Sequence, residues 1–381
     1  MRIARVEATP LAVPLRQEFH WAGGTQVGAN LVLVAVTTDD GVVGYGEVVT
    51  DAPAAVAEYV RLIARQIAGL PCGDVEAILR SIWTQGRWKT TPQFTQFVVA
   101  GIEAACCDAL GRTLGTPSRT FFGGPVREEL DYFAFVQGDD PDTLAAHARE
   151  LADHDVVYMK VGRPRDDDAC VAAVRDAIGP GKLLRVDPNE AWDAATAVDR
   201  IRRLSIYDLD WVEQPVPHWD VAGLAHVRRK VDVKIAADQA VYTTQQPRQV
   251  LEREAADVVV QGPHDAGGLL RFRQQAFLCA AWGLNVNLHA FMQSEISFLA
   301  QAQVASTIHN LTNGNQVMHQ LLAERLTSSP AVDVVAGKYR PGDAPGHGFE
   351  IDVDAVGRAH QRWRRDGAYD TIESVYGGNR G

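Results

Sequence analysis

The stretch Trp211-Val212-Glu213-Gln214-Pro215 decides the fold, because two other stretches repeat its form at regular distances. In each, a short apolar run ends in an acidic residue and a segment of helical character follows. The acids Asp187, Glu213 and Asp238 are separated by 213 − 187 = 26 and 238 − 213 = 25 residues, roughly the length of one strand and one helix. A parallel barrel strand is buried on both faces, so it is continuously apolar and admits chemistry only at its carboxyl end. The pattern predicts an α/β barrel with one acid at the end of each of three successive strands.

Three such acids would converge at the mouth of the barrel. Carboxylates held close together cannot all stay charged without a cation, since each raises the pKa of the others. Hard oxygen ligands suit Mg²⁺. The sequence therefore predicts that Asp187, Glu213 and Asp238 bind Mg²⁺; the alternative for any one of them is an exposed acid at a strand end.

The composition is that of a soluble globular protein, with 46% hydrophobic and 22% charged residues among 381. The net charge of −11 argues against nucleic-acid binding, which needs a basic face. It is compatible with an anionic substrate, because a bound metal inverts the local field. The five cysteines lack metal-ligand spacing and indicate buried, reduced thiols. With neither a signal peptide nor an apolar run of about 20 residues, we expect a cytoplasmic protein and no membrane partner.

The rhythm of apolar residues divides the chain into three parts. Residues 1–125 begin with alternating strand-like runs and continue with helical runs, which predicts an α+β domain. Residues 126–340 alternate between strand and helix, which predicts a modified TIM (β/α)7–8 barrel. Residues 341–381 are predicted to pack back on the N-terminal domain. The expected barrel strands are Tyr132–Val136, Val156–Gly162, Leu183–Asp187, Leu209–Glu213, Val233–Asp238, Val258–Gln261, Asn285–His289 and a segment near Gln316–Leu321.

Several local motifs, in order along nearly the whole chain, resemble the enolase superfamily in its mandelate racemase and muconate lactonizing branch. The motifs are Asp40-Gly41-Val42-Val43-Gly44-Tyr45-Gly46-Glu47, the helix from Ala104 to Gly111 followed by Phe122-Gly123-Gly124, Lys160-Val161-Gly162, Val186-Asp187-Pro188-Asn189, Val212-Glu213-Gln214-Pro215, Gly267-Gly268 and Pro345-Gly346-His347-Gly348-Phe349-Glu350-Ile351. The resemblance implies an N-terminal α+β capping domain over a modified TIM barrel. It also implies that a base removes the proton α to a substrate carboxylate, while Mg²⁺ stabilises the enediolate.

The resemblance also assigns roles to residues. Asp187, Glu213 and Asp238 match the metal-ligand positions, and Lys160 matches the base at the end of the second strand. A lysine acts as a base near neutral pH only if its pKa is lowered, which a nearby cation and desolvation achieve. His289 ends the seventh strand, where sugar-acid dehydratases and mandelate racemase of this family place a histidine.

Two positions depart from the family pattern. Tyr158 stands where many relatives carry a second lysine; it is expected to hydrogen-bond the substrate carboxylate or the Lys160 amine, or else to fill the core. The sixth strand lacks the lysine of the cycloisomerase branch. Asp265, which follows that strand, is out of register with the aspartate that usually orients the histidine, so the sequence gives His289 no partner.

Four further residues are candidate substrate contacts. Asn189 follows the third predicted strand, although ordinary turn polarity explains it equally well. His20 and Trp21 fall in the loop that closes over the substrate in relatives. His319 lies near the eighth strand, where relatives often carry a glutamate, and it would substitute for that residue.

The resemblance leaves the overall reaction open. Lys160 as base and His289 as acid favour dehydration of a sugar acid to a 2-keto-3-deoxy acid. The alternatives are a racemase, epimerase or cycloisomerase acting on a hydroxy, amino or lactone acid, and a catalytically inactive homologue that binds metal and ligand. The expected partners are a small-molecule carboxylate and further copies of the chain, because relatives commonly form dimers or octamers.

Overall fold

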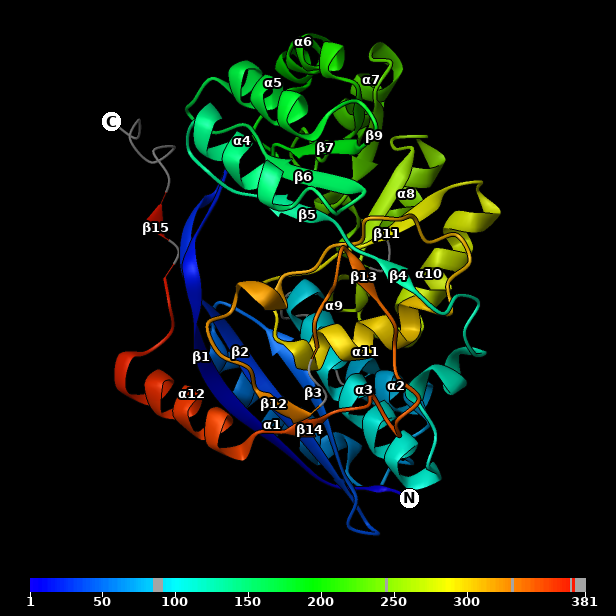
Figure 1. Ribbon diagram of the computed structural model, residues 1–381. Coiled ribbons are helices and arrows are strands. Elements are labelled where there is room, and N and C mark those ends of the chain that lie inside the picture. The colour runs from blue at the N-terminus through cyan, green and yellow to red at the C-terminus, as the bar shows by residue number, and fades with distance from the viewer. Residues whose placement is uncertain (85–91, 244–245, 330–331, 371, 374–381) are drawn as a thin grey trace, which may run out of the picture.

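The computed structural model describes residues 1–84, 92–243, 246–329, 332–370 and 372–373. It contains an antiparallel sheet with helices, formed by the beginning of the chain, beneath a curved parallel sheet surrounded by helices (Figure 1). This arrangement confirms the predicted fold of an α+β domain joined to a modified barrel.

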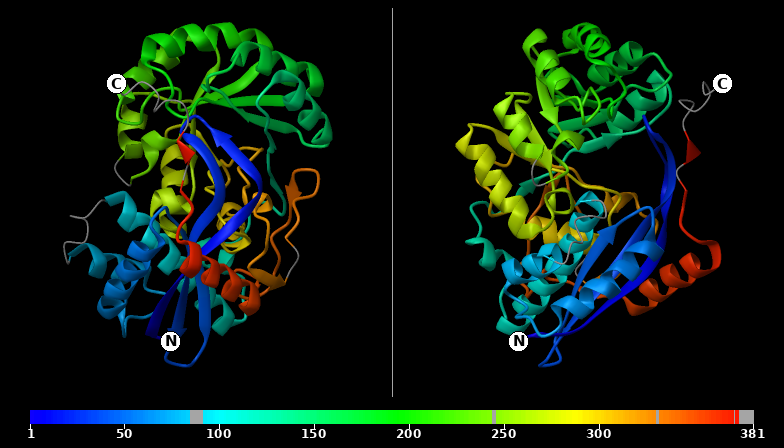
Figure 2. Two further views of the ribbon diagram at one scale, coloured as in Figure 1. Left: turned by 90° about the vertical axis from the view of Figure 1, so that its left-hand side faces the viewer. Right: turned by 180° about the vertical axis from the view of Figure 1, so that it is seen from behind.

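The N-terminal sheet is built on two long strands. β1 (Ile3–Trp21) pairs antiparallel with β2 (Gly24–Thr38), which pairs in turn with β3 (Val43–Val49). The first strand is longer than predicted, because His20 and Trp21 pair with Thr25 and Gly24 rather than forming a loop. The hairpin of β1 and β2 therefore extends as paired strands toward the barrel (Figure 2).

Three helices cover this sheet: α1 (Pro53–Ile67), α2 (Val75–Thr84) and α3 (Pro92–Leu114). Within the described ranges, α3 is the one helix whose length and composition would suffice to cross a membrane, but 83% of its most apolar window is buried inside the protein. It is a core helix that lies close against β3. An added Cβ at Gly46 would stand 2.1 Å from the carbonyl oxygen of Gly101.

The parallel sheet has seven strands in the spatial order β11-β10-β9-β8-β7-β6-β5. They are β5 (Ala134–Val136), β6 (Val156–Lys160), β7 (Leu183–Asp187), β8 (Leu209–Glu213), β9 (Lys234–Ala237), β10 (Val258–Gln261) and β11 (Asn285–Leu288). The helices that follow them along the chain are α4 (Pro141–Glu150), α5 (Asp167–Ile178), α6 (Ala194–Leu204), α7 (Val221–Lys230), α8 (Gln246–Glu252), α9 (Pro263–Ala266), α10 (Leu269–Ala281) and α11 (Glu295–Ala305). Seven predicted strands thus occur at or within two residues of the expected positions.

The predicted eighth strand near Gln316–Leu321 is wrong, because His319–Leu321 form a short 3₁₀ turn. The barrel is closed by residues slightly earlier in the sequence, where Leu311 forms an isolated bridge to Val286 and Asn315 forms one to Tyr132. The buried Arg185 guanidinium strengthens this irregular edge by donating to the carbonyl oxygens of Gly314 (2.7 Å) and Asn313 (2.9 Å).

The remaining elements tie the two parts together. They are β4 (Leu130–Asp131), β12 (Thr327–Ser329), β13 (Lys338–Tyr339), β14 (Glu350–Ile351), α12 (Val353–Asp366) and β15 (Ile372–Glu373). Helix α12 lies along β1, where Arg362 donates to the carbonyl oxygen of Ala12 (2.7 Å), and β15 pairs with β2 near the hairpin tip.

A buried carboxylate joins β3 to the segment after β11. Glu47 accepts hydrogen bonds from the backbone N–H of Ser294 (3.0 Å) and the hydroxyl of Ser297 (2.8 Å). Burial outweighs these bonds and raises the pKa of Glu47 to about 7. Because a buried acceptor is costly to leave unpaired, this contact fixes the position of the barrel segment that carries Phe291 and Met292.

The close approach of β3 and α3 generates a stability prediction. Gly46→Ala should lower the free energy of unfolding by roughly 2–3 kcal/mol, because its new methyl group meets helix backbone that cannot move aside cheaply. Gly181→Ala is the matched control, since no atom lies within 4 Å of a Cβ added there. Urea denaturation of both variants measures the difference. Equal stability of the two would contradict the proposed close packing.

Candidate active site

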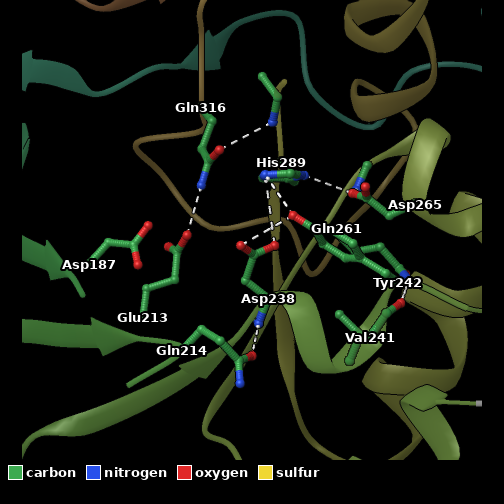
Figure 3. Close-up of polar contacts among 12 residues, drawn as sticks. Asp187, Glu213, Gln214, Asp238, Val241, Tyr242, Gln261, Asp265, His289 and Gln316 are labelled. Atoms are coloured by element: carbon green, nitrogen blue, oxygen red, sulfur yellow. Dashed lines mark hydrogen bonds and ion pairs between the residues drawn. The ribbon is translucent and has the colours of Figure 1, made fainter. Parts of the chain in front are cut away.

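The residues predicted to bind the metal or to act in catalysis meet at the carboxyl ends of the barrel strands, in a cavity of about 410 Å³. Asp187 ends β7, Glu213 ends β8 and Asp238 directly follows β9, so their carboxylates form a row across neighbouring strands (Figure 3). Lys160, at the end of β6, and His289, directly after β11, lie at the two ends of this row.

The Lys160 end is held by a dense set of hydrogen bonds. The Lys160 amine donates to Asp187 Oδ2 (2.5 Å). The Tyr158 hydroxyl donates to the same oxygen (2.5 Å) and to Glu213 Oε1 (3.0 Å). Gln316 Nε2 also donates to Glu213 Oε1 (3.1 Å). Each donor offsets part of the repulsion between buried carboxylates.

Tyr158 combines two of the roles predicted for it. Its ring lies parallel to that of Phe133, with centroids 4.6 Å apart and an interplanar angle of 7°. Its hydroxyl lies 3.5 Å from the Lys160 amine and bridges two carboxylates. Burial, together with the charges of Asp187 and Glu213, raises the pKa of Tyr158 well above its usual value. The phenol therefore stays protonated and acts as a donor.

The acids are costly to charge in this position. Burial and the neighbouring Asp187 raise the pKa of Glu213 to about 7. Burial also raises the pKa of Asp238 well above the usual carboxyl value, against the lowering effect of His289. Glu213 Oε2 and Asp238 Oδ1 are buried without a hydrogen-bond partner among the described residues. Orphaned, hard oxygen atoms of this kind fit a divalent cation such as Mg²⁺.

The arrangement is not already that of a closed metal site. Across the described parts of the chain, no group of three His, Cys, Asp or Glu side chains has the spacing of a metal centre. The oxygens of Asp187 and Glu213 instead accept hydrogen bonds from the Tyr158 hydroxyl, and Asp187 also accepts one from the Lys160 amine. Metal binding therefore requires some of these hydrogen bonds to be exchanged for the cation.

His289 has an acidic partner that the sequence did not identify. Its Nδ1 lies 2.9 Å from Asp265 Oδ2, and Asp265 is fully buried. The prediction that Asp265 is out of register was wrong, because the short helix α9 begins directly after β10 and turns the carboxylate back under the ring. A carboxylate on Nδ1 fixes the ring so that Nε2 faces the cavity.

The surroundings of His289 favour its charged form. Burial alone would lower its pKa, but the carboxylates of Asp238 and Asp265 outweigh that effect and raise the pKa to about 9. On the cavity side, Nε2 lies 3.4 Å from the Tyr242 hydroxyl and 3.8 Å from Asp238 Oδ1. His289 is thus set up to hold and deliver a proton at Nε2.

Of the four predicted substrate contacts, two line the cavity and two do not. Asn189 and Trp21 line the cavity, whereas His20 and His319 are absent from its lining. His20 Nδ1 pairs with the hydroxyl of Thr25 (2.9 Å). His319 lies against Phe298 with Nε2 3.2 Å from the Val332 carbonyl oxygen, and burial lowers its pKa to about 4. His319 thus lies outside the cavity lining, in the 3₁₀ turn that stands in place of the predicted eighth strand.

Gln316 and Tyr242 are among the lining residues that sequence reasoning missed. Gln316, rather than His319, points from the irregular closing segment into the site, because its backbone N–H donates to Leu288 (2.9 Å). Tyr242, in the turn after β9, contacts both Asp238 and His289 at 3.4 Å. No motif marks Tyr242, whereas Gln316 lies within the stretch predicted as the eighth strand.

Comparisons with known proteins place this fold and site in a family. Residues 3–123 match the model of the mandelate racemase / muconate lactonizing enzyme N-terminal domain, and residues 143–356 match that of the enolase C-terminal domain-like family. The chain belongs to the enolase superfamily, in its mandelate racemase and muconate lactonizing branch.

The relatives catalyse more than one reaction. The chain is 28% identical to a probable glucarate dehydratase of Streptomyces coelicolor, over 96% of this chain and 93% of the relative. It is 29% identical to muconate cycloisomerase 1 of Rhodococcus opacus, over 96% and 99%. The structure resembles that of an enolase from Thermobispora bispora complexed with magnesium and formate, with a TM-score of 0.87, 28% identity and coverage of 97% and 96%. The family is therefore clear, and these identities leave the particular reaction undetermined.

The contact between His289 and Asp265 generates a prediction about protonation. Asp265→Asn should lower the pKa of His289 from about 9, because the variant removes a negative charge that stabilises the imidazolium while the ring stays buried. The ring would then lose its proton at a lower pH than in the wild type. NMR titration of ¹⁵N-labelled histidine measures this shift. Asp232→Asn, away from the buried row, is the control, and an equal pKa of His289 in both variants would contradict the assigned pairing.

Proposed function

We propose that this protein is an enzyme that removes the proton α to a carboxylate, and that it dehydrates a 2,3-dihydroxy acid to a 2-keto-3-deoxy acid. Sugar acids are the substrates that the sequence favours for this reaction. The observation that carries the proposal is the pairing of His289 with Asp265, at the opposite end of the carboxylate row from Lys160. One proton-accepting and one proton-donating group are thereby available to the same substrate.

The carboxylates would hold Mg²⁺. Asp187, Glu213 and Asp238 would supply the ligands, and Glu213 Oε2 and Asp238 Oδ1 lack a hydrogen-bond partner among the described residues, although Asp238 Oδ1 lies 3.8 Å from His289 Nε2. When bound there, the cation supplies positive charge next to the substrate carboxylate, where negative charge develops as the α-proton leaves. The oxygen donor set and the magnesium in the structure of a relative support this choice.

The protein groups then move protons in a balanced sequence. Lys160, after it has released its own proton, takes the proton from C2, and the electron pair passes into the carboxylate. As that pair returns to form the C2=C3 bond, the C3–O bond breaks, and His289 donates the proton that turns the leaving hydroxide into water. The enol at C2 becomes a ketone when C3 gains a proton. The net change is the loss of one water molecule.

Racemisation or epimerisation is the second candidate, favoured by the same two groups. If Lys160 and His289 face opposite sides of C2, one group removes the proton and the other returns a proton to the other face. This outcome requires no hydroxyl at C3. It differs from dehydration in the mass of the product, which makes the two reactions easy to separate.

The roles of Lys160 and His289 can be tested by isotope exchange. In D₂O with Mg²⁺, the wild type should replace the α-proton of its substrate, and Lys160→Ala should reduce the rate by about 10³-fold or more through loss of a general base. His289→Asn should block the loss of water more strongly than it blocks exchange. Mass spectrometry follows both events. Lys230→Ala, an exposed lysine at the end of α7, should behave as the wild type.

Unchanged exchange in Lys160→Ala would exclude this lysine as the base. A product that gains deuterium without losing water would move the assignment from dehydratase to racemase or epimerase.

The metal assignment has its own test. Asp238→Asn should weaken Mg²⁺ binding by about 10-fold or more, because it replaces a charged ligand with a neutral one and leaves the shape of the side chain almost unchanged. Isothermal titration with MgCl₂ measures the affinity directly. Asp232→Asn again serves as the control. An unchanged affinity in Asp238→Asn would show that the ion binds elsewhere.

A further inference from the structure

The cavity above the carboxylate row has two aromatic walls. On the Lys160 side, Phe133 lies against Tyr158, and Phe135 stacks on Phe19 with ring centroids 5.2 Å apart. Phe19 belongs to β1, so this wall joins the hairpin of the capping domain to the barrel. These rings are at most 6% exposed, so they give the cavity a tightly packed apolar border beside the substrate carboxylate.

The second wall stands on the His289 side. Phe291 packs edge-on against the His289 ring, with centroids 4.4 Å apart and an interplanar angle of 79°. Phe97, from α3, contacts Phe291 at 5.0 Å. Met292 and Met318 complete the apolar lining. The space between the two walls is therefore bordered by aromatic rings and thioethers above the charged floor.

The polar atoms of the lining are distributed unevenly. The buried lining atoms without a hydrogen-bond partner in the described ranges include four acceptors at the floor: Glu213 Oε2, Asp238 Oδ1, Asn189 Oδ1 and Gln239 Oε1. One orphaned donor, Trp21 Nε1, belongs to a lining residue of the hairpin. The other polar lining residues of the capping domain, such as Gln26 and Thr50, keep partial contact with water.

Positive charge is equally limited. Among the lining residues that the structure describes, Lys160 is the only lysine or arginine, and it is paired with Asp187 at the floor. The His289 imidazolium is likewise paired there, with Asp265 and Asp238. A second carboxylate on a substrate would need a cationic partner when removed from water. A chain of hydroxyl groups would find hydrogen-bond partners at the floor and at lining residues such as Gln26, Thr50 and Asp51, but none on the aromatic rings of the walls.

We infer that the substrate is a 2-hydroxy or 2,3-dihydroxy monocarboxylic acid whose body beyond C3 is apolar, an aryl or branched alkyl group. This inference rests on the proposed function, because the floor must hold the carboxylate and C2. The apolar body lies between the Phe133 and Phe291 walls, and Trp21 Nε1 donates to a single acceptor at its outer end. Sugar acids, which the sequence alone favours, match these walls poorly, and dicarboxylic acids do so as well.

Binding measured apart from turnover tests the inference. Isothermal titration in the presence of Mg²⁺ would compare 2,3-dihydroxy-3-phenylpropanoate and 2-hydroxy-3-phenylpropanoate with gluconate and glucarate. The phenyl acids should bind at least about 30-fold more tightly, since apolar surface is buried between aromatic rings. Equal or tighter binding of a sugar acid would overturn the inference, and so would failure of the phenyl acids to bind.

A substitution in the wall on the Lys160 side tests whether that wall contacts the apolar group of the substrate. Phe19→Ala should weaken binding of the phenyl acids by about 10-fold, because it removes one face of the wall, and should leave gluconate binding unchanged. Phe277→Ala, whose side chain is 68% exposed on α10, is the matched control. Equal effects of Phe19→Ala on both classes of acid would contradict the assigned wall.

The same titrations separate the two proposals. A phenyl acid that binds with the expected preference but exchanges no α-proton in D₂O would support the substrate class and contradict the proposed reaction. A sugar acid that binds more tightly and is dehydrated would support the reaction and overturn the substrate class.

Discussion

The confinement of negative charge at one end of the barrel is the constraint on which the rest of the site depends. Asp187, Glu213, Asp238 and Asp265 are all buried there, each no more than 1% exposed. The cationic groups in contact with them are Lys160 and His289, one at each end of the row. Isolated buried charges are too costly to persist, so every acid must share a proton, a hydrogen bond or a cation.

This constraint explains why the two ends of the row differ. At the Lys160 end, the Tyr158 hydroxyl adds a donor without adding charge, so an amine and a phenol share Asp187. At the His289 end, Asp265 adds a negative charge and thereby keeps the imidazolium stable. A divalent cation at the centre would relieve the remaining repulsion and would loosen the hold of Asp187 on the lysine. The proposed base and the proposed acid are thus distinguished by their partners as well as by their residue types.

The acids at the strand ends could be predicted from the sequence because buried parallel strands are continuously apolar and end in polar residues. Asp187, Glu213 and Asp238 follow apolar runs at nearly constant spacing, so their convergence follows from the order of residues alone. Asp265 was missed because its position depends on the short helix α9, which reverses the chain directly after β10. Gln316 and His319 were confused for a related reason: the closing segment makes bridges rather than a strand, so no alternation marks which side chains face inward.

The walls of the cavity are built from different structural elements than its floor. The floor residues sit at or directly after the ends of strands within one sheet, whereas Phe19, Phe97 and Phe291 come from β1, from α3 and from the segment after β11. Glu47 holds the last of these segments against the capping domain through Ser294 and Ser297, so the separate elements keep a common geometry. A change in any wall element alters the group that fits above the carboxylates without moving the strand ends. The same proton transfer can therefore act on acids whose groups beyond C3 differ widely. In this chain the aromatic walls favour an apolar group at that position.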